Sequence, residues 1–122
     1  MASDMFTIAD YRNREARDMS EKQLMAVVLR AARRLDWLVY HTHDSRRSAP
    51  GFPDILAIRK ADRIGLPSEI LVIELKAAMG NTTPEQDAWL DHFRAAGIEV
   101  AVWRPAQWVS GEIVARLARR EG

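Results

Sequence analysis

Three charged residues interrupt two apolar segments that otherwise resemble buried β-strands. Asp54 precedes residues 55–58, whereas Glu74 and Lys76 lie at the end of residues 70–76. Because side chains alternate between the two faces of a strand, Glu74 and Lys76 point to the same face. A buried charge without a partner is costly, so these groups need one another, a bound cation, or both. The pattern predicts a metal site, with an inert internal ion pair between Lys76 and one carboxylate as the alternative.

The order of five motifs along the chain resembles one nuclease family. The motifs are Glu21, Gly51-Phe52-Pro53-Asp54, Glu74-Leu75-Lys76, Thr83-Pro84-Glu85-Gln86, and Ala96-Gly97 followed by residues 100–105. Pro-Asp followed at a distance by Glu-x-Lys resembles the PD-(D/E)XK nuclease superfamily. The whole set is similar to the VRR-NUC (virus-type replication-repair nuclease) family over about residues 20–114. This resemblance implies a restriction-endonuclease-like fold and metal-dependent cleavage of DNA.

The resemblance also implies a role for each residue of the site. Asp54 and Glu74 would bind Mg²⁺ or Mn²⁺, and the backbone carbonyl of Leu75 would be a third ligand. Glu21 would bind a second metal or hold a metal-bound water. Lys76 can orient the attacking water and stabilise developing negative charge. Oxygen donors suit hard divalent cations, whereas zinc favours cysteine and histidine ligands, so zinc and organic cofactors are not expected.

Two capping boxes predict helix starts, at residues 20–23 and at residues 83–86. The helical period turns Glu21 and Gln86 toward the apolar faces of their helices, so both side chains are predicted to point inward. Each has a simpler alternative. Glu21 could only complement the helix dipole, and Gln86 could only be the reciprocal cap. The family resemblance implies instead that Gln86 supports the active site, which one rotamer cannot combine with capping.

A polar, basic loop leads from the first predicted strand to Asp54. Residues 41–44 contain two histidines and an aspartate, but without further histidines a strand-end or surface role is favoured over metal ligation. Arg46 and Arg47 are candidate contacts to DNA backbone phosphates, and His43 is a third. Solvated loop arginines are the alternative interpretation.

The remaining patterns predict the elements that position these residues. Helices are expected over about residues 20–35, 83–96 and 113–117, and strands over residues 37–41, 54–59, 69–76 and 98–103. The order αβββαβα predicts a mixed four-stranded sheet flanked by helices. Residues 1–19 are interpreted as an N-terminal arm, and residues 20–122 as a single nuclease domain.

Composition limits the class of protein. The chain has 122 residues, of which 48% are hydrophobic, carries a net charge of +1 and contains no cysteine. These values are typical of one compact domain in a reducing cytosol, and no apolar segment is long enough for a membrane span. The family resemblance implies the cytosol of a bacterial cell or of a phage-infected host.

The function expected from these features is that of a metal-dependent DNA endonuclease, with four-way junctions, flaps or other branched DNA as implied substrates. The alternative is a non-catalytic DNA-binding or recombination accessory protein that retains the nuclease scaffold. A homodimer is expected from the resemblance and from Trp103 and Trp108, since exposed aromatic residues favour an interface. Both tryptophans could instead cap the core of a monomer.

Overall fold

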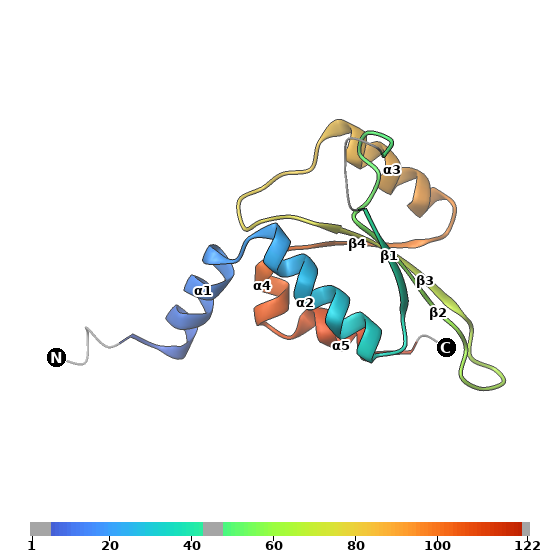
Figure 1. The fold of residues 1–122 in the computed structure, drawn as a ribbon, viewed down its shortest axis with the longest axis horizontal. Coiled ribbons are helices and arrows are strands. Elements are labelled where there is room, and N and C mark those ends of the chain that lie inside the picture. Colours follow the sequence, from blue (N-terminus) through green and yellow to red (C-terminus); the bar gives the residue numbers. More distant parts are fainter. Residues whose placement is uncertain (1–5, 43–47, 121–122) are drawn as a thin grey trace.

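The computed structural model describes residues 6–42 and 48–120, in which the elements follow the order ααβββαβαα (Figure 1). The helices are α1 (Ile8–Asp18), α2 (Glu21–Arg34), α3 (Pro84–Ala95), α4 (Pro105–Val109) and α5 (Glu112–Ala118). The strands are β1 (Leu38–His41), β2 (Ile55–Arg59), β3 (Glu69–Leu75) and β4 (Glu99–Trp103). The predicted α/β fold, with its restriction-endonuclease-like mixed sheet, is confirmed.

Helices at both chain ends extend the predicted pattern. The predicted last helix is α5, and a separate short helix, α4, precedes it; Gly111 adopts φ 87° between the two and interrupts the helical path. Residues 7–18, in the predicted arm, begin with a capping box between Thr7 and Asp10 and form α1. This helix contacts α4, although none of its side chains is buried.

The sheet has the strand order β1-β2-β3-β4. The first three strands form antiparallel neighbours, and β4 lies parallel to β3 after the crossover through α3. In the central pair Ile55 lies opposite Ile73, and in the parallel pair Glu74 lies opposite Val102. The ends of β2, β3 and β4 that surround Glu74 are therefore neighbours in space.

Alternation of side chains divides the sheet into two faces covered by different helices. One face carries Ile55, Leu71 and Ile73, all at most 1% exposed, which belong to the core shared with α2 and α5. The opposite face carries Val72 and Glu74, and α3 lies on that side (Figure 1). Glu74 is thus on the α3 side of the sheet, away from the main core.

The two predicted capping boxes are confirmed. Ser20 Oγ accepts a hydrogen bond from the backbone N–H of Gln23 at 3.1 Å, and Thr83 Oγ1 accepts one from Gln86 at 3.2 Å. In turn, Oε1 of each glutamine accepts a hydrogen bond from the backbone N–H of the capping residue, at 2.8 Å in both cases. These caps fix where α2 and α3 begin, and with them the positions of Glu21 and Gln86.

A buried charged network joins the end of the sheet remote from Glu74 to α5. Glu69 accepts hydrogen bonds from Arg59 at 2.8 and 3.0 Å and lies 3.4 Å from Arg116, which also binds Glu99 at 2.7 Å. The guanidinium of Arg59 lies over the ring of Trp37, 4.3 Å from its centroid. Arg59, Glu69 and Arg116 are each at most 8% exposed. Mutual pairing is what makes their burial tolerable.

The structure does not support an interface built on the C-terminal tryptophans. Trp103 is 5% exposed and belongs to the core, so an exposed position for it was wrong. Trp108 is half-buried and packs against the same core. The alternative in which both residues complete the core of the monomer is the one that the structure supports.

Among the described residues, no helix is long and apolar enough to cross a membrane.

The network at Glu69 predicts a large stability effect. Glu69→Ala leaves Arg59 and Arg116 buried with too few acceptors, and we expect it to lower the free energy of unfolding by about 3–5 kcal/mol. The matched control is Asp91→Ala, which breaks an exposed 3.2 Å ion pair with Arg94 and should cost less than about 1 kcal/mol. Urea denaturation followed by tryptophan fluorescence measures both. Similar losses in the two variants would contradict this account of the network.

Candidate active site

Asp54 and Glu74 are held together by the register of β2 and β3. Asp54 immediately precedes β2, opposite Glu74 in the antiparallel pairing. The backbone N–H of Asp54 donates to Glu74 Oε1 at 3.3 Å, and Asp54 Oδ2 accepts from the backbone N–H of Leu75 at 2.7 Å. The start of β2 is therefore joined to residues 74 and 75 of β3 by one bond to each carboxylate. The carboxylates have little freedom to move apart.

Lys76 completes the cluster from the end of β3. Its Nζ lies 3.4 Å from Glu74 Oε2, and both residues are buried, with Lys76 8% and Glu74 1% exposed. The backbone N–H of Lys76 donates to the carbonyl oxygen of Trp103 at 3.0 Å, which extends the pairing of β3 with β4 by one residue. The structure thus brings Asp54, Glu74 and Lys76 together at one end of β2 and β3.

The cluster carries more negative than positive charge. Burial raises the pKa of Glu74 to about 8, helped by the charge of Asp54 and a hydrogen bond with it, while Lys76 acts in the opposite direction. The cluster thus contains two carboxyl groups and one ammonium group, which lies against Glu74. A metal-free site favours a proton on Glu74 near neutral pH, because that proton relieves the repulsion.

The donor atoms of the cluster suit a hard divalent cation. Mg²⁺ is commonly bound through one or two carboxylates together with waters and substrate phosphates. Asp54 and Glu74 provide the two carboxylates, and the carbonyl of Leu75 belongs to the residue between Glu74 and Lys76. A bound cation would also remove the excess negative charge that raises the pKa of Glu74. In residues 6–42 and 48–120, no larger group of His, Cys, Asp or Glu side chains gathers where it could hold a metal.

Arg104 supports the segment that follows Lys76, and the sequence analysis had assigned it no such role. Its Nη1 donates to the carbonyl oxygen of Ala77 at 3.0 Å and to that of Gly80. These bonds link the turn after β3 to the end of β4. The only sequence signal was its place before Pro105, where it marks the end of a strand.

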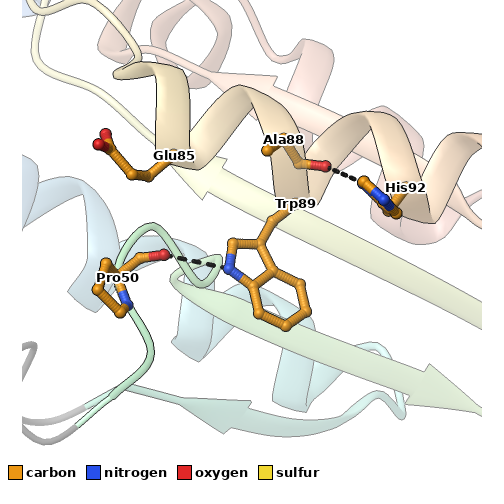
Figure 2. Close-up of a pocket in the computed structure, with 5 residues that line it drawn as sticks. All are labelled: Pro50, Glu85, Ala88, Trp89 and His92. Carbon is orange, nitrogen blue, oxygen red and sulfur yellow. Dashed lines mark hydrogen bonds between the residues drawn. The ribbon is translucent and has the colours of Figure 1, made fainter.

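The loop before Asp54 is fixed against the first turn of α3. Gly51 has φ 81°, and a Cβ atom there would lie 2.6 Å from the backbone nitrogen of Gln86, so only glycine fits. Trp89 Nε1 donates to the carbonyl oxygen of Pro50 at 3.1 Å (Figure 2). The ring of Phe52 packs edge-on against Trp89 at a centroid distance of 5.1 Å. These contacts hold the loop that precedes Asp54 against α3.

Two further predicted site residues, Glu21 and Gln86, lie in the first turns of α2 and α3. Glu21 is exposed in the first turn of α2, so the prediction that it points inward is wrong. Gln86 uses Oε1 to cap α3, which is the simpler of its two predicted roles. His43, Arg46 and Arg47 lie outside the described residues.

An Asp at the start of the second strand and a Glu-x-Lys at the end of the third, on a mixed α/β sheet, define a nuclease of the PD-(D/E)XK type. The chain belongs to the VRR-NUC domain family, whose model matches residues 7–107. The match begins just before α1, includes Asp54, Glu74 and Lys76, and ends within α4. No match was found among curated proteins or among solved structures.

The raised pKa of Glu74 predicts a pH-dependent stability of the metal-free protein. Glu74 has an ordinary pKa of 4.5 and a folded-state pKa of about 8, so the folded protein binds the extra proton between these values. The stabilisation that protonated Glu74 contributes to the free energy of unfolding is therefore fully present below about pH 4.5 and is lost as the pH rises through about 8. Within this window the slope is at most about 1.4 kcal/mol per pH unit.

Glu74→Gln removes the titrating group and keeps a hydrogen-bonding side chain. In EDTA, we expect the variant to gain stability relative to the wild type as the pH rises from 5 to 8. Urea unfolding at several pH values measures this difference. A constant difference across the range would show that Glu74 does not titrate as described.

Proposed function

We propose that this protein is a Mg²⁺- or Mn²⁺-dependent endodeoxyribonuclease that hydrolyses phosphodiester bonds in branched DNA such as flaps or four-way junctions. The observation that carries the proposal is the cluster of Asp54, Glu74 and Lys76 in a chain of the VRR-NUC family. All three residues lie at one end of β2 and β3, where substrate and solvent have access through half-buried Asp54.

The residues of the cluster divide the chemical tasks. Asp54 and Glu74 would hold the cation together with the carbonyl of Leu75, and the cation when bound supplies Lewis-acid polarisation of the phosphate and acidifies a water molecule. Lys76 remains close to Glu74 and would donate a hydrogen bond to the attacking water or to the phosphate oxygen that gains charge. Fixed groups of this kind need little reorganisation during the reaction.

The other assigned residues would act around this centre. Glu21 is exposed at the start of α2, and its carboxylate would hold a second metal or a metal-bound water once DNA is present. Gln86 caps α3 through Oε1 in this structure, so its proposed support of the site would require a different rotamer of its side chain. Arg46, Arg47 and His43 precede the loop at Gly51 and would contact backbone phosphates. A cytosolic location remains a prediction.

The proposed chemistry separates metal binding from turnover. Asp54→Asn keeps an acceptor for the backbone N–H of Leu75 but removes a charged ligand, so we expect it to lose Mn²⁺ affinity and to cleave flap DNA about 100-fold more slowly or worse. Lys76→Ala should bind Mn²⁺ at least as tightly as the wild type, because lysine is no metal ligand and its charge opposes the cation, yet show a comparable loss of cleavage.

Calorimetric titration with Mn²⁺ and single-turnover cleavage of labelled flap and four-way-junction DNA test both variants. Asp91→Asn, an exposed change on α3, is the control and should behave as the wild type. Undiminished cleavage by Asp54→Asn would exclude the proposed site. Binding of DNA by the wild type without cleavage in any divalent cation would favour the non-catalytic accessory protein instead.

The active form is proposed to be a homodimer, because paired incision of a branched DNA needs two active sites and a two-fold dimer supplies them. An exposed apolar row on the sheet supports this proposal in place of the tryptophans. Leu38, Ile58 and Ile70 lie opposite one another on β1, β2 and β3 and are 77%, 39% and 44% exposed. Tyr40 lies on the same face and is also exposed.

If the protein is a dimer, sedimentation velocity at micromolar concentration should give a mass of about twice the 13.9 kDa of one chain. Leu38→Glu places a charge in the apolar row and should shift the protein toward the monomer. Ile64→Glu changes a fully exposed residue outside the row and should leave the assembly unchanged. A monomeric wild type that still makes paired cuts in a four-way junction would show that this dimer does not supply the second site.

A further inference from the structure

A groove of about 360 Å³ opens between α3 and the loop that leads to Asp54. Figure 2 shows its lining residues, which are Pro50, Glu85, Ala88, Trp89 and His92. Four of these lie on α3 at spacings of three and four residues, so they form one stripe along the helix. The small side chain of Ala88 in the middle of the stripe leaves the space that forms the groove.

We propose that this groove binds a single unpaired nucleobase of the DNA substrate; the inference rests on the proposed nuclease function and specifies its substrate. The size of the groove is suitable, because a cavity of about 150 Å³ holds a benzene ring and this one is more than twice as large. Its lining is mainly apolar, with the indole of Trp89 and the ring of Pro50 on it. Nucleobases of any sequence stack on aromatic side chains.

The polar groups of the groove favour a base over a phosphate. Glu85 is an exposed carboxylate, which repels phosphate but accepts hydrogen bonds from amino groups such as N4 of cytosine. Nδ1 of His92 lies 2.7 Å from the carbonyl oxygen of Ala88 (Figure 2). Because a carbonyl only accepts, Nδ1 carries the proton, and Nε2 is the acceptor of the neutral ring. The edge of the groove therefore offers acceptors to a ligand that carries N–H donors.

The groove is mechanically tied to the candidate active site. Pro50 lies four residues before Asp54, and its carbonyl is bound by Trp89 at 3.1 Å. Gly51 packs directly on the backbone of Glu85 and Gln86, so the loop is in close contact with the first turn of α3. A nucleotide held in the groove would therefore be placed at a fixed position relative to Asp54.

This placement gives a physical reason for selecting branched DNA. Bases within a duplex are stacked and paired, and extracting one costs free energy. Flaps and junctions present bases that are already unpaired or easily unpaired. A groove that accepts one such base stabilises their complexes and gains little from intact duplex.

The test fills the groove and removes the base. Ala88 is exposed, so Ala88→Leu should fold normally while occupying the space, and Ala95→Leu is the matched control at an exposed position of α3 outside the groove. Binding is measured by fluorescence anisotropy with Ca²⁺ for a flap DNA, for the same flap with abasic nucleotides placed singly around the branch point, and for duplex.

We expect Ala88→Leu to weaken flap binding by about tenfold, in the range for stacking of one base, and to leave duplex binding unchanged. An abasic nucleotide at one position should weaken binding of the wild type by a similar factor. The two changes together should give no further loss, because both remove the same contact. Ala95→Leu should match the wild type on every DNA.

Additive losses, equal losses on flap and duplex, or no loss at any abasic position would overturn the proposal. Cleavage with Mg²⁺ is measured on the same DNAs to keep the two hypotheses apart. Wild-type cleavage of flap DNA with unaltered binding by Ala88→Leu would reject the groove and retain the nuclease. Coupled binding losses without cleavage by any variant would support the groove and reject the nuclease.

Discussion

The proximity of two carboxylates to one ammonium group is the interaction on which the rest of the structure depends. Asp54 and Glu74 repel one another, and Lys76 compensates only part of that charge. The arrangement persists because backbone N–H groups of Asp54 and Leu75 bind the carboxylates across β2 and β3. A shift of one residue in the register of β2 and β3 would break these hydrogen bonds, so the site depends on this register being fixed.

The same two strands are fixed at their other end by a second charged pair. Arg59 ends β2 opposite Glu69, which begins β3, and hydrogen bonds of 2.8 and 3.0 Å join them. At that end the charges are balanced by Arg116 and Glu99, whereas the site end is left with excess negative charge. A balanced network at one end of a strand pair can thus stabilise the register that an unbalanced cluster at the other end requires.

Local patterns in the sequence were sufficient for the elements and for the centre of the site. Capping boxes located α2 and α3, and strand alternation placed Glu74 and Lys76 on one face. The same patterns failed for Glu21, because a helical period gives the direction of a side chain but not whether the core extends to the first turn. Charged residues at strand ends normally lie at the surface, so the buried network around Glu69 required knowledge of where α5 packs. Contacts that join segments distant in the chain, such as Arg104 with Gly80, carried no signal that local spacing could provide.

The difference in charge balance between the two ends of β2 and β3 would affect how the protein binds its proposed cation. Burial and the neighbouring Asp54 raise the pKa of Glu74, so Glu74 would release a proton when a divalent ion binds. Folding stability and metal affinity would then both depend on pH. The free energy lost by holding Asp54 and Glu74 together without a metal would be regained if the proposed cation bound between them. Lys76 is positively charged and would therefore oppose tight metal binding in the proposed nuclease. Such a site favours a weakly held, exchangeable cation, which is the behaviour expected of Mg²⁺ with its retained waters.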